Sequence, residues 1–180
     1  MPLAVTHILA AIILVELFRE YVIKNNYAFP RYYILIAAIA GVVPDFDFAL
    51  VYILYPFGFS IDALHKTFMH TLFVPLIFLI IGLITYKYQI KNINVTKHHM
   101  KIPMVFYILA AGSLLHLILD GLFAGAIMLF YPLSNYAIGL NLLALAPETL
   151  QGIIPATIDG ILLLFWLFWL EFKIKVDNYF

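Results

Sequence analysis

The sequence predicts an all-α protein, a polytopic helical bundle that crosses a membrane about five times. Of the 180 residues, 65% are hydrophobic and 11% are charged, whereas soluble domains are about 45–50% apolar and about 25% charged. The mean hydropathy is +1.03. Apolar runs of about 20 residues, the length that crosses the hydrocarbon core of a bilayer, recur along the chain. We therefore expect one membrane domain over residues 1–180, with the lipid bilayer as its first partner.

Five apolar runs are the expected spans, at residues 3–22, 33–55, 68–86, 103–131 and 153–172. The first run lacks the positively charged start of a cleaved signal peptide, so we expect it to be retained. The second is interrupted by Pro44, which removes a backbone donor and disfavours helical geometry at the preceding residue. The fourth is long enough to tilt or to protrude from the membrane.

The segment at 132–152, PLSNYAIGLNLLALAPETLQG, is apolar but contains two prolines. It lies on the outer side if the five spans alternate. A re-entrant lid and a pair of helices on the membrane surface both fit this pattern, and the sequence leaves the two open.

Lysine and arginine residues predict the orientation, because short cytoplasmic loops are enriched in them. If five spans alternate, nine of the ten basic residues fall on one side and only Lys66 falls on the other. We therefore expect a multi-pass protein of the cell membrane (an inner or plasma membrane), with the N-terminus outside and the C-terminus in the cytoplasm.

Charge and cysteine content exclude other classes of function. The formal net charge is zero, so no broad basic surface predicts nucleic acid as a partner. The chain has no cysteine, which excludes a disulfide framework and thiolate chemistry. Neither pattern predicts an oligomeric state.

Ionisable residues within these apolar runs cost free energy unless they are paired or neutralised. In GVVPDFD, Asp45 and Asp47 follow the helix-breaking proline. In LLHLILD, His116 and Asp120 are spaced i, i+4 and share one face of a helix. Three further histidines are His7, His65 and His70. On the expected topology, these histidines and the four residues above all lie at a similar depth on the outer side of the membrane.

Imidazoles and carboxylates together suit zinc, with manganese or iron as alternatives. Seven such side chains exceed the needs of one tetrahedral ion, so we expect one or two divalent ions. Two ions about 3.5–4 Å apart would stabilise both the attacking and the leaving oxygens of a hydrolysis. The candidate metal ligands are His7, Asp45, Asp47, His65, His70, His116 and Asp120. The candidate catalytic residues among them are Asp45, Asp47, His116 and Asp120.

Each of these features also has a structural alternative. Asp45 could cap a helix that resumes at the next residue. His116 and Asp120 could form a hydrogen bond that packs two helices together. His65 could be an ordinary solvated residue at the interface, and Lys66 beside it could contact either a substrate or lipid headgroups.

The order of these elements resembles the YdjM-like family of predicted membrane-bound metal-dependent hydrolases. The elements are THILAA, GVVPDFD, HKTFMHT, LLHLILDGL and GAIMLFYPLS, over about residues 6–134. The resemblance implies a metal role for the seven candidate ligands and substrate contacts for Lys66 and Ser134. Lys66 and Thr71 stand where the family usually has Arg and Ser. Lysine keeps the charge but loses the bidentate geometry with which arginine binds phosphate.

We therefore expect an integral-membrane metal-dependent hydrolase that cleaves a phosphoester or another ester of a lipid or lipid-linked substrate at the extracytoplasmic side. One alternative is a transporter or ion-translocating protein with a cation site at the discontinuous second helix. The other is a non-catalytic membrane scaffold stabilised by metal. Cation flux through the protein would indicate the first alternative, and bound metal without turnover would indicate the second.

Overall fold

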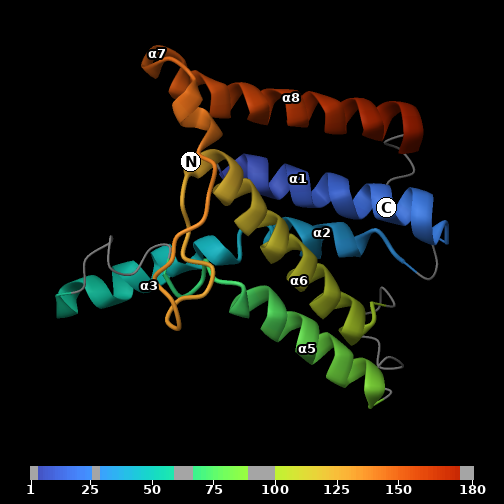
Figure 1. Ribbon diagram of the computed structural model, residues 1–180. Helices are drawn as coiled ribbons and strands as arrows, with labels where there is room; N and C mark the ends of the chain where they lie inside the picture. Colours follow the sequence, from blue (N-terminus) through green and yellow to red (C-terminus); the bar gives the residue numbers. More distant parts are fainter. Residues whose placement is uncertain (1–3, 26–28, 59–66, 89–99, 175–180) are drawn as a thin grey trace.

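The computed structural model describes residues 4–25, 29–58, 67–88 and 100–174. Within these residues the regular structure is helical, and an isolated antiparallel β bridge joins Ile127 and Ile138. The prediction of an all-α fold is therefore confirmed for the part of the chain that the structure describes (Figure 1).

The helices follow the apolar runs of the sequence. They are α1 (Ala4–Leu17), α2 (Tyr32–Ala40), α3 (Asp47–Leu54), α5 (Phe73–Lys87), α6 (Ile102–Leu119), α7 (Glu148–Gln151) and α8 (Ile153–Trp169). Three helices continue as π-helical turns, at Phe18–Ile23 after α1, Asp120–Ala124 after α6 and Leu170–Ile174 after α8. Short 3-10 turns lie at Pro44–Phe46, Tyr55–Phe57 and Leu142–Leu145.

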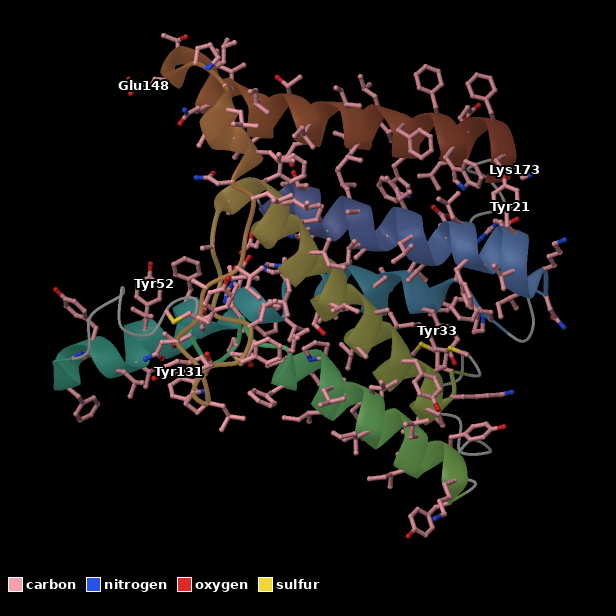
Figure 2. The ribbon with its side chains drawn as sticks, viewed as in Figure 1. Tyr21, Tyr33, Tyr52, Tyr131, Glu148 and Lys173 are labelled. Atoms are coloured by element: carbon pink, nitrogen blue, oxygen red, sulfur yellow. The ribbon has the colours of Figure 1, made fainter. Side chains whose placement is uncertain are left out.

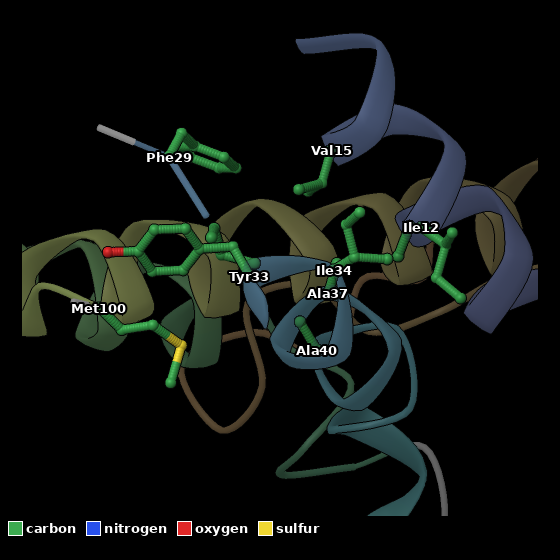
Figure 3. Close-up of a cluster of buried hydrophobic side chains, with 10 residues drawn as sticks. Ile12, Val15, Phe29, Tyr33, Ile34, Ala37, Ala40 and Met100 are labelled. Carbon is green, nitrogen blue, oxygen red and sulfur yellow. The ribbon is translucent and has the colours of Figure 1, made fainter. Parts of the chain in front are cut away.

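The core lies where α1, α2 and α6 pack together (Figure 3). Ala37 and Ala40 on α2 are fully buried. A Cβ added at Gly112 of α6 would lie 2.4 Å from the Cβ of Ala40, so small residues allow these two helices to approach closely. The Tyr33 hydroxyl accepts a hydrogen bond from the backbone nitrogen of Lys101 at 2.6 Å and joins the starts of α2 and α6.

The helices α5 and α8 lie at the periphery, α5 along α6 and α8 along α1 (Figure 1). Two side-chain hydrogen bonds join α8 to α1. The Thr6 hydroxyl donates to Asp159, and the Trp166 indole donates to Glu16 at 3.1 Å. Figure 2 shows that Lys173 and Tyr21 lie close together where α8 and α1 end, with the Lys173 ammonium 6.0 Å from the Tyr21 ring centroid.

The described residues contain two or three candidate membrane spans, and so bear out only part of the predicted five. Among the described residues, two helices are long and apolar enough to cross a membrane, Ile102–Ala124 and Glu148–Lys173. A third span results if Tyr32–Ala40 and Pro44–Phe57, bent by 57°, are counted as one broken span. The helix Phe73–Lys87 is apolar but shorter. The first helix has three charged residues near its end, Glu16, Arg19 and Glu20.

The break at Pro44 is present as predicted, because α2 ends at Ala40 and a 3-10 turn begins at the proline. The fourth run is helical only as far as Ala124, and the chain then turns at Gly125, whose φ of 104° favours glycine. The segment at 132–152 contains a loop, a 3-10 turn and the short helix α7. It is therefore not a pair of long surface helices.

Candidate metal centre

Six of the seven predicted ligands converge at one place in the bundle. His7 comes from α1, Asp45 from the 3-10 turn between α2 and α3, and Asp47 is the first residue of α3. His70 lies in the segment before α5, and the pair from the end of α6 is His116 and Asp120. We call these six residues the His/Asp cluster. The seventh predicted ligand, His65, and its neighbour Lys66 lie outside the described residues.

Three atoms of the cluster form a nearly equilateral triangle. The Asp45 Oδ1 atom lies 3.4 Å from His70 Nε2 and 3.5 Å from His116 Nε2. The two imidazole nitrogens are 3.4 Å apart. Ligands about 2.0–2.1 Å from a tetrahedral zinc ion are separated by about 3.3–3.4 Å, so this triangle has the size of one face of such a site. All three ligand atoms lie close enough together to hold one ion.

The Asp120 carboxylate faces two groups of imidazoles at once. Its Oδ2 atom lies 3.5 Å from His70 Nε2 and 3.7 Å from His116 Nε2. Its Oδ1 atom lies 3.4 Å from His7 Nε2. His7, His116 and Asp120 therefore form a second group that could hold a metal ion. The two oxygens of one carboxylate thus point to two neighbouring candidate ion positions.

The backbone of Gly41 sets the orientation of His116. The His116 Nδ1 atom lies 2.7 Å from the Gly41 carbonyl oxygen, which can only accept a hydrogen bond, so Nδ1 carries the proton. Nε2 then has a free lone pair, as in metal sites where the second ring nitrogen bonds to a carbonyl. Because one lone pair binds one ion, the two groups that include His116 cannot both use it.

Gly41 also lets α1 approach this site. A Cβ at Gly41 would lie 2.5 Å from the His7 carbonyl oxygen, so any larger residue would push the two helices apart. The His7 ring stacks on the His116 ring with centroids 3.8 Å apart.

Asp47 lies beside His70 on the side away from the triangle. The Asp47 Oδ2 atom is 3.2 Å from His70 Nδ1, whereas the other ring nitrogen faces Asp45. A carboxylate that accepts a proton from the second ring nitrogen is the usual outer partner of a metal-binding histidine. The two acids of the PDFD element thus contact opposite nitrogens of one imidazole.

The cluster is deeply buried, and several of its polar atoms are unpaired. Both Asp120 oxygens, Asp45 Oδ1 and His7 Nδ1 have no hydrogen-bond partner in the described part of the chain. The ion-pair partners of Asp120 among the described residues are all histidines. Buried carboxylate oxygens without partners are costly. A divalent cation would neutralise them, so the residues present fit a metal ion.

Only one side chain of the His/Asp cluster is substantially accessible to solvent. The side chains of His7, His70, His116, Asp47 and Asp120 are nearly inaccessible, whereas that of Asp45 is 21% exposed. Water and a substrate therefore have their nearest described approach at Asp45.

The remaining predicted substrate contact, Ser134, lies in the loop after α6. Its hydroxyl accepts a hydrogen bond from the Tyr136 nitrogen at 3.1 Å, and no described contact joins it to the His/Asp cluster. Sequence reasoning did not identify Gly41 as part of the site. The available signal was a glycine three residues before the proline of PDFD.

Comparisons with curated proteins and with solved structures gave no significant match. The family model for the YdjM inner membrane protein, however, matches residues 1–176, almost the whole chain. The match includes every member of the His/Asp cluster. The chain belongs to the YdjM inner membrane protein family.

Proposed function

We propose that this chain is an integral-membrane metal-dependent hydrolase. It cleaves a phosphoester or another ester of a lipid or lipid-linked substrate at the extracytoplasmic side. One observation carries the proposal. Three imidazoles and three carboxylates meet in the His/Asp cluster, where Asp45 Oδ1 and both oxygens of Asp120 have no hydrogen-bond partner among the described residues. Membership of an inner membrane protein family supports the membrane setting.

Zinc is the metal that best matches these donors, with manganese or iron as alternatives. Asp45, His70 and His116 would hold one ion, and Asp120 Oδ2 lies beside the same two imidazole nitrogens. His7 and Asp120, whose Oδ1 lies 3.4 Å from His7 Nε2, would hold a second ion. When bound, divalent ions activate water and stabilise the charge that develops on ester oxygens.

The other residues of the cluster orient these ligands. The Asp47 carboxylate lies 3.2 Å from Nδ1 of His70, and the Gly41 carbonyl accepts the Nδ1 proton of His116. Both contacts keep an Nε2 lone pair directed into the site. We therefore assign Asp47 as a positioning residue, and Asp45, at the exposed edge, as the ligand nearest to the substrate.

We further propose that the cluster end of the bundle faces outward. The opposite end carries basic residues, as cytoplasmic ends of membrane proteins do. They lie at the end of α1, the start of α2, the end of α5, the start of α6 and the end of α8, and comprise Arg19, Lys24, Arg31, Lys87, Lys101 and Lys173. On this proposal α1 and α5 also lie within the bilayer, beside α8 and α6, which gives five membrane segments with the broken pair of α2 and α3.

The test is metal content together with turnover. We expect the purified protein in lipid nanodiscs to contain one or two zinc, manganese or iron ions per chain and to hydrolyse at least one lipid phosphoester or carboxylester. The double variant Asp45→Ala with Asp120→Ala should lose both properties. Wild-type protein without stoichiometric metal would contradict the proposal, as would cation flux into proteoliposomes that disappears in Asp45→Asn.

A further inference from the structure

Two neighbouring cavities lie along α6, the larger between α6 and α5 and the smaller between α6 and the loop that follows it. One has a volume of about 310 Å³ and the other of about 650 Å³, and Leu72 and Leu114 line both. These volumes fall within the range of ligand pockets, about 300–1,000 Å³. Because they share two lining residues, we treat them as one groove, the α5–α6 groove.

The smaller cavity is lined by residues that are neighbours of the His/Asp cluster in the chain. Leu117 and Gly121 line it, and they follow His116 and Asp120 in the chain. Leu72, which lines both cavities, lies two residues after the histidine that precedes α5. Adjacent Cα atoms are about 3.8 Å apart, so the groove ends within a side chain's length of the ligand backbone.

The loop after α6 covers this end of the groove. The Leu129 carbonyl accepts a hydrogen bond from the Leu72 nitrogen at 2.9 Å. The Gly121 carbonyl accepts one from the Leu140 nitrogen at 2.7 Å. Ile127 and Ile138, paired in the β bridge, both line the smaller cavity. The loop is thus fastened over the groove at two points.

The lining selects the chemistry of the occupant. Its residues are leucine, isoleucine, phenylalanine, alanine, proline and glycine, and Tyr107 is the one residue with a polar side-chain group. A sugar, peptide or headgroup would lose its hydrogen bonds to water here without replacement. A hydrocarbon chain loses nothing and buries apolar surface.

The groove is also open to its surroundings. Leu76 and Ile118 line it while 47% and 49% exposed, so a chain can enter from the side. In the bilayer, that side is lipid.

We propose that the α5–α6 groove binds one hydrocarbon chain of the lipid substrate and so holds the scissile ester at the His/Asp cluster. The inference rests on the proposed hydrolase function and adds its specificity: one long apolar chain, entering laterally between α5 and α6, is the recognised part of the substrate.

Photolabelling in nanodiscs tests the groove without relying on turnover. The probe is a phospholipid with a diazirine in one acyl chain. We expect labelled peptides to come from residues 72–79, 107–121 and 127–140. Ala111 lines the larger cavity and is exposed, so Ala111→Trp fills the groove without entering the core. This variant should reduce the labelling at least about fivefold.

The matched control is Ala156→Trp, which makes the same change at an exposed position of α8 and lines no described cavity. It should leave the labelling unchanged within about twofold. Labelling spread over α8 as strongly as over α5 and α6 would overturn the proposal. So would labelling that Ala111→Trp leaves intact, or a cross-link of α5 to a second copy of the chain in place of lipid.

Failure of the groove and failure of the hydrolase are separable. If both proposals are correct, Asp45→Ala with Asp120→Ala abolishes metal binding and leaves the acyl label in place; if only the hydrolase is wrong, the label stays in the groove while the wild-type protein lacks metal or turnover. If only the groove is wrong, the wild-type protein keeps its metal and turnover while the label is random. A correct groove further predicts that Ala111→Trp raises KM for a long-chain ester and leaves KM for a short-chain ester of the same headgroup unchanged.

Discussion

Asp120 and Glu16 are both buried acids on apolar helices, but their neighbours differ. Glu16, on α1, accepts a hydrogen bond from the Trp166 indole at 3.1 Å, and the positive charges of Arg31 and Arg19 act on it. Asp120, after α6, faces imidazoles, and neither of its oxygens has a hydrogen-bond partner in the described part of the chain.

The difference separates a structural acid from a candidate ligand. Guanidinium groups are permanently charged and have no lone pair to offer, so Arg31 and Arg19 favour the ionised form of Glu16 but cannot bind a cation. An imidazole nitrogen that carries no proton, by contrast, offers a lone pair to a cation. Changes around Asp120 should therefore affect metal binding, and changes around Glu16 should affect only stability.

The largest expected effect is that of Asp120→Ala. The substitution removes both oxygens that face the two candidate ion positions, so metal affinity should fall by more than about 100-fold, beyond the loss caused by an outer partner. Isothermal titration of the metal-stripped protein measures this loss. The comparison variant is Glu16→Gln, for which we expect wild-type affinity. Equal losses in the two variants would remove the distinction between the two acids.

The next effect is that of Gly41→Ala. The added Cβ would meet the His7 carbonyl oxygen at 2.5 Å, so α1 must shift away from α2. We expect a loss of stability of about 1–3 kcal/mol, typical of overpacking, together with weaker metal binding. Gly160→Ala on α8 is the control, because nothing lies within 4 Å of its added Cβ. It should be neutral or stabilise the helix by about 0.5–1 kcal/mol. Thermal unfolding measures the stability of both variants, and a Gly41→Ala protein as stable as Gly160→Ala would contradict the close approach of α1 at Gly41.

Asp47→Asn tests whether Asp47 orients His70 or binds the metal directly. The amide can still accept the Nδ1 proton of His70, but it lacks the charge that strengthens this contact. Metal affinity should fall about 10–100-fold, the usual cost of changing an outer partner. Glu148→Gln, on the short helix α7, removes an exposed acid and should leave the affinity unchanged. A loss as large as that of Asp120→Ala would make Asp47 a direct ligand.

The smallest effect on metal should come from Trp166→Phe. This change leaves Glu16 Oε2 without its donor, and an unsatisfied buried acceptor costs about 1–3 kcal/mol. Trp169 is the matched control, because its indole nitrogen has no hydrogen-bond partner among the described residues, so Trp169→Phe should cost less. Both variants should bind metal as the wild type does. Metal loss in Trp166→Phe would show that the two acids are coupled.

Sequence patterns predicted the helical fold and much of the cluster. The i, i+4 spacing of His116 and Asp120 and the break at Pro44 are local features, and the structure contains both. The distinct contacts of Asp45 and Asp47 were not predictable, because they depend on how a 3-10 turn presents two acids to one imidazole from another segment. The role of Gly41 was missed because it acts through a backbone carbonyl.

The ends of the membrane helices were harder to predict, because they depend on turns that hydropathy does not show. Hydropathy alone continues the fourth run to residue 131, but the chain turns at Gly125, and the following residues pair as a loop against Leu72 and Gly121. The third run begins at 68 in hydropathy, yet α5 begins at Phe73, after the segment that carries His70. In both places a local turn interrupts an otherwise continuous apolar run close in the chain to a residue of the His/Asp cluster.

X-ray absorption at the metal edge of the purified wild-type protein tests the central claim most directly. We predict stoichiometric metal with nitrogen and oxygen ligands at about 2.0–2.1 Å and outer-shell scattering from more than one imidazole. Protein that binds no stoichiometric metal, or metal whose spectrum lacks imidazole scattering, would contradict the account.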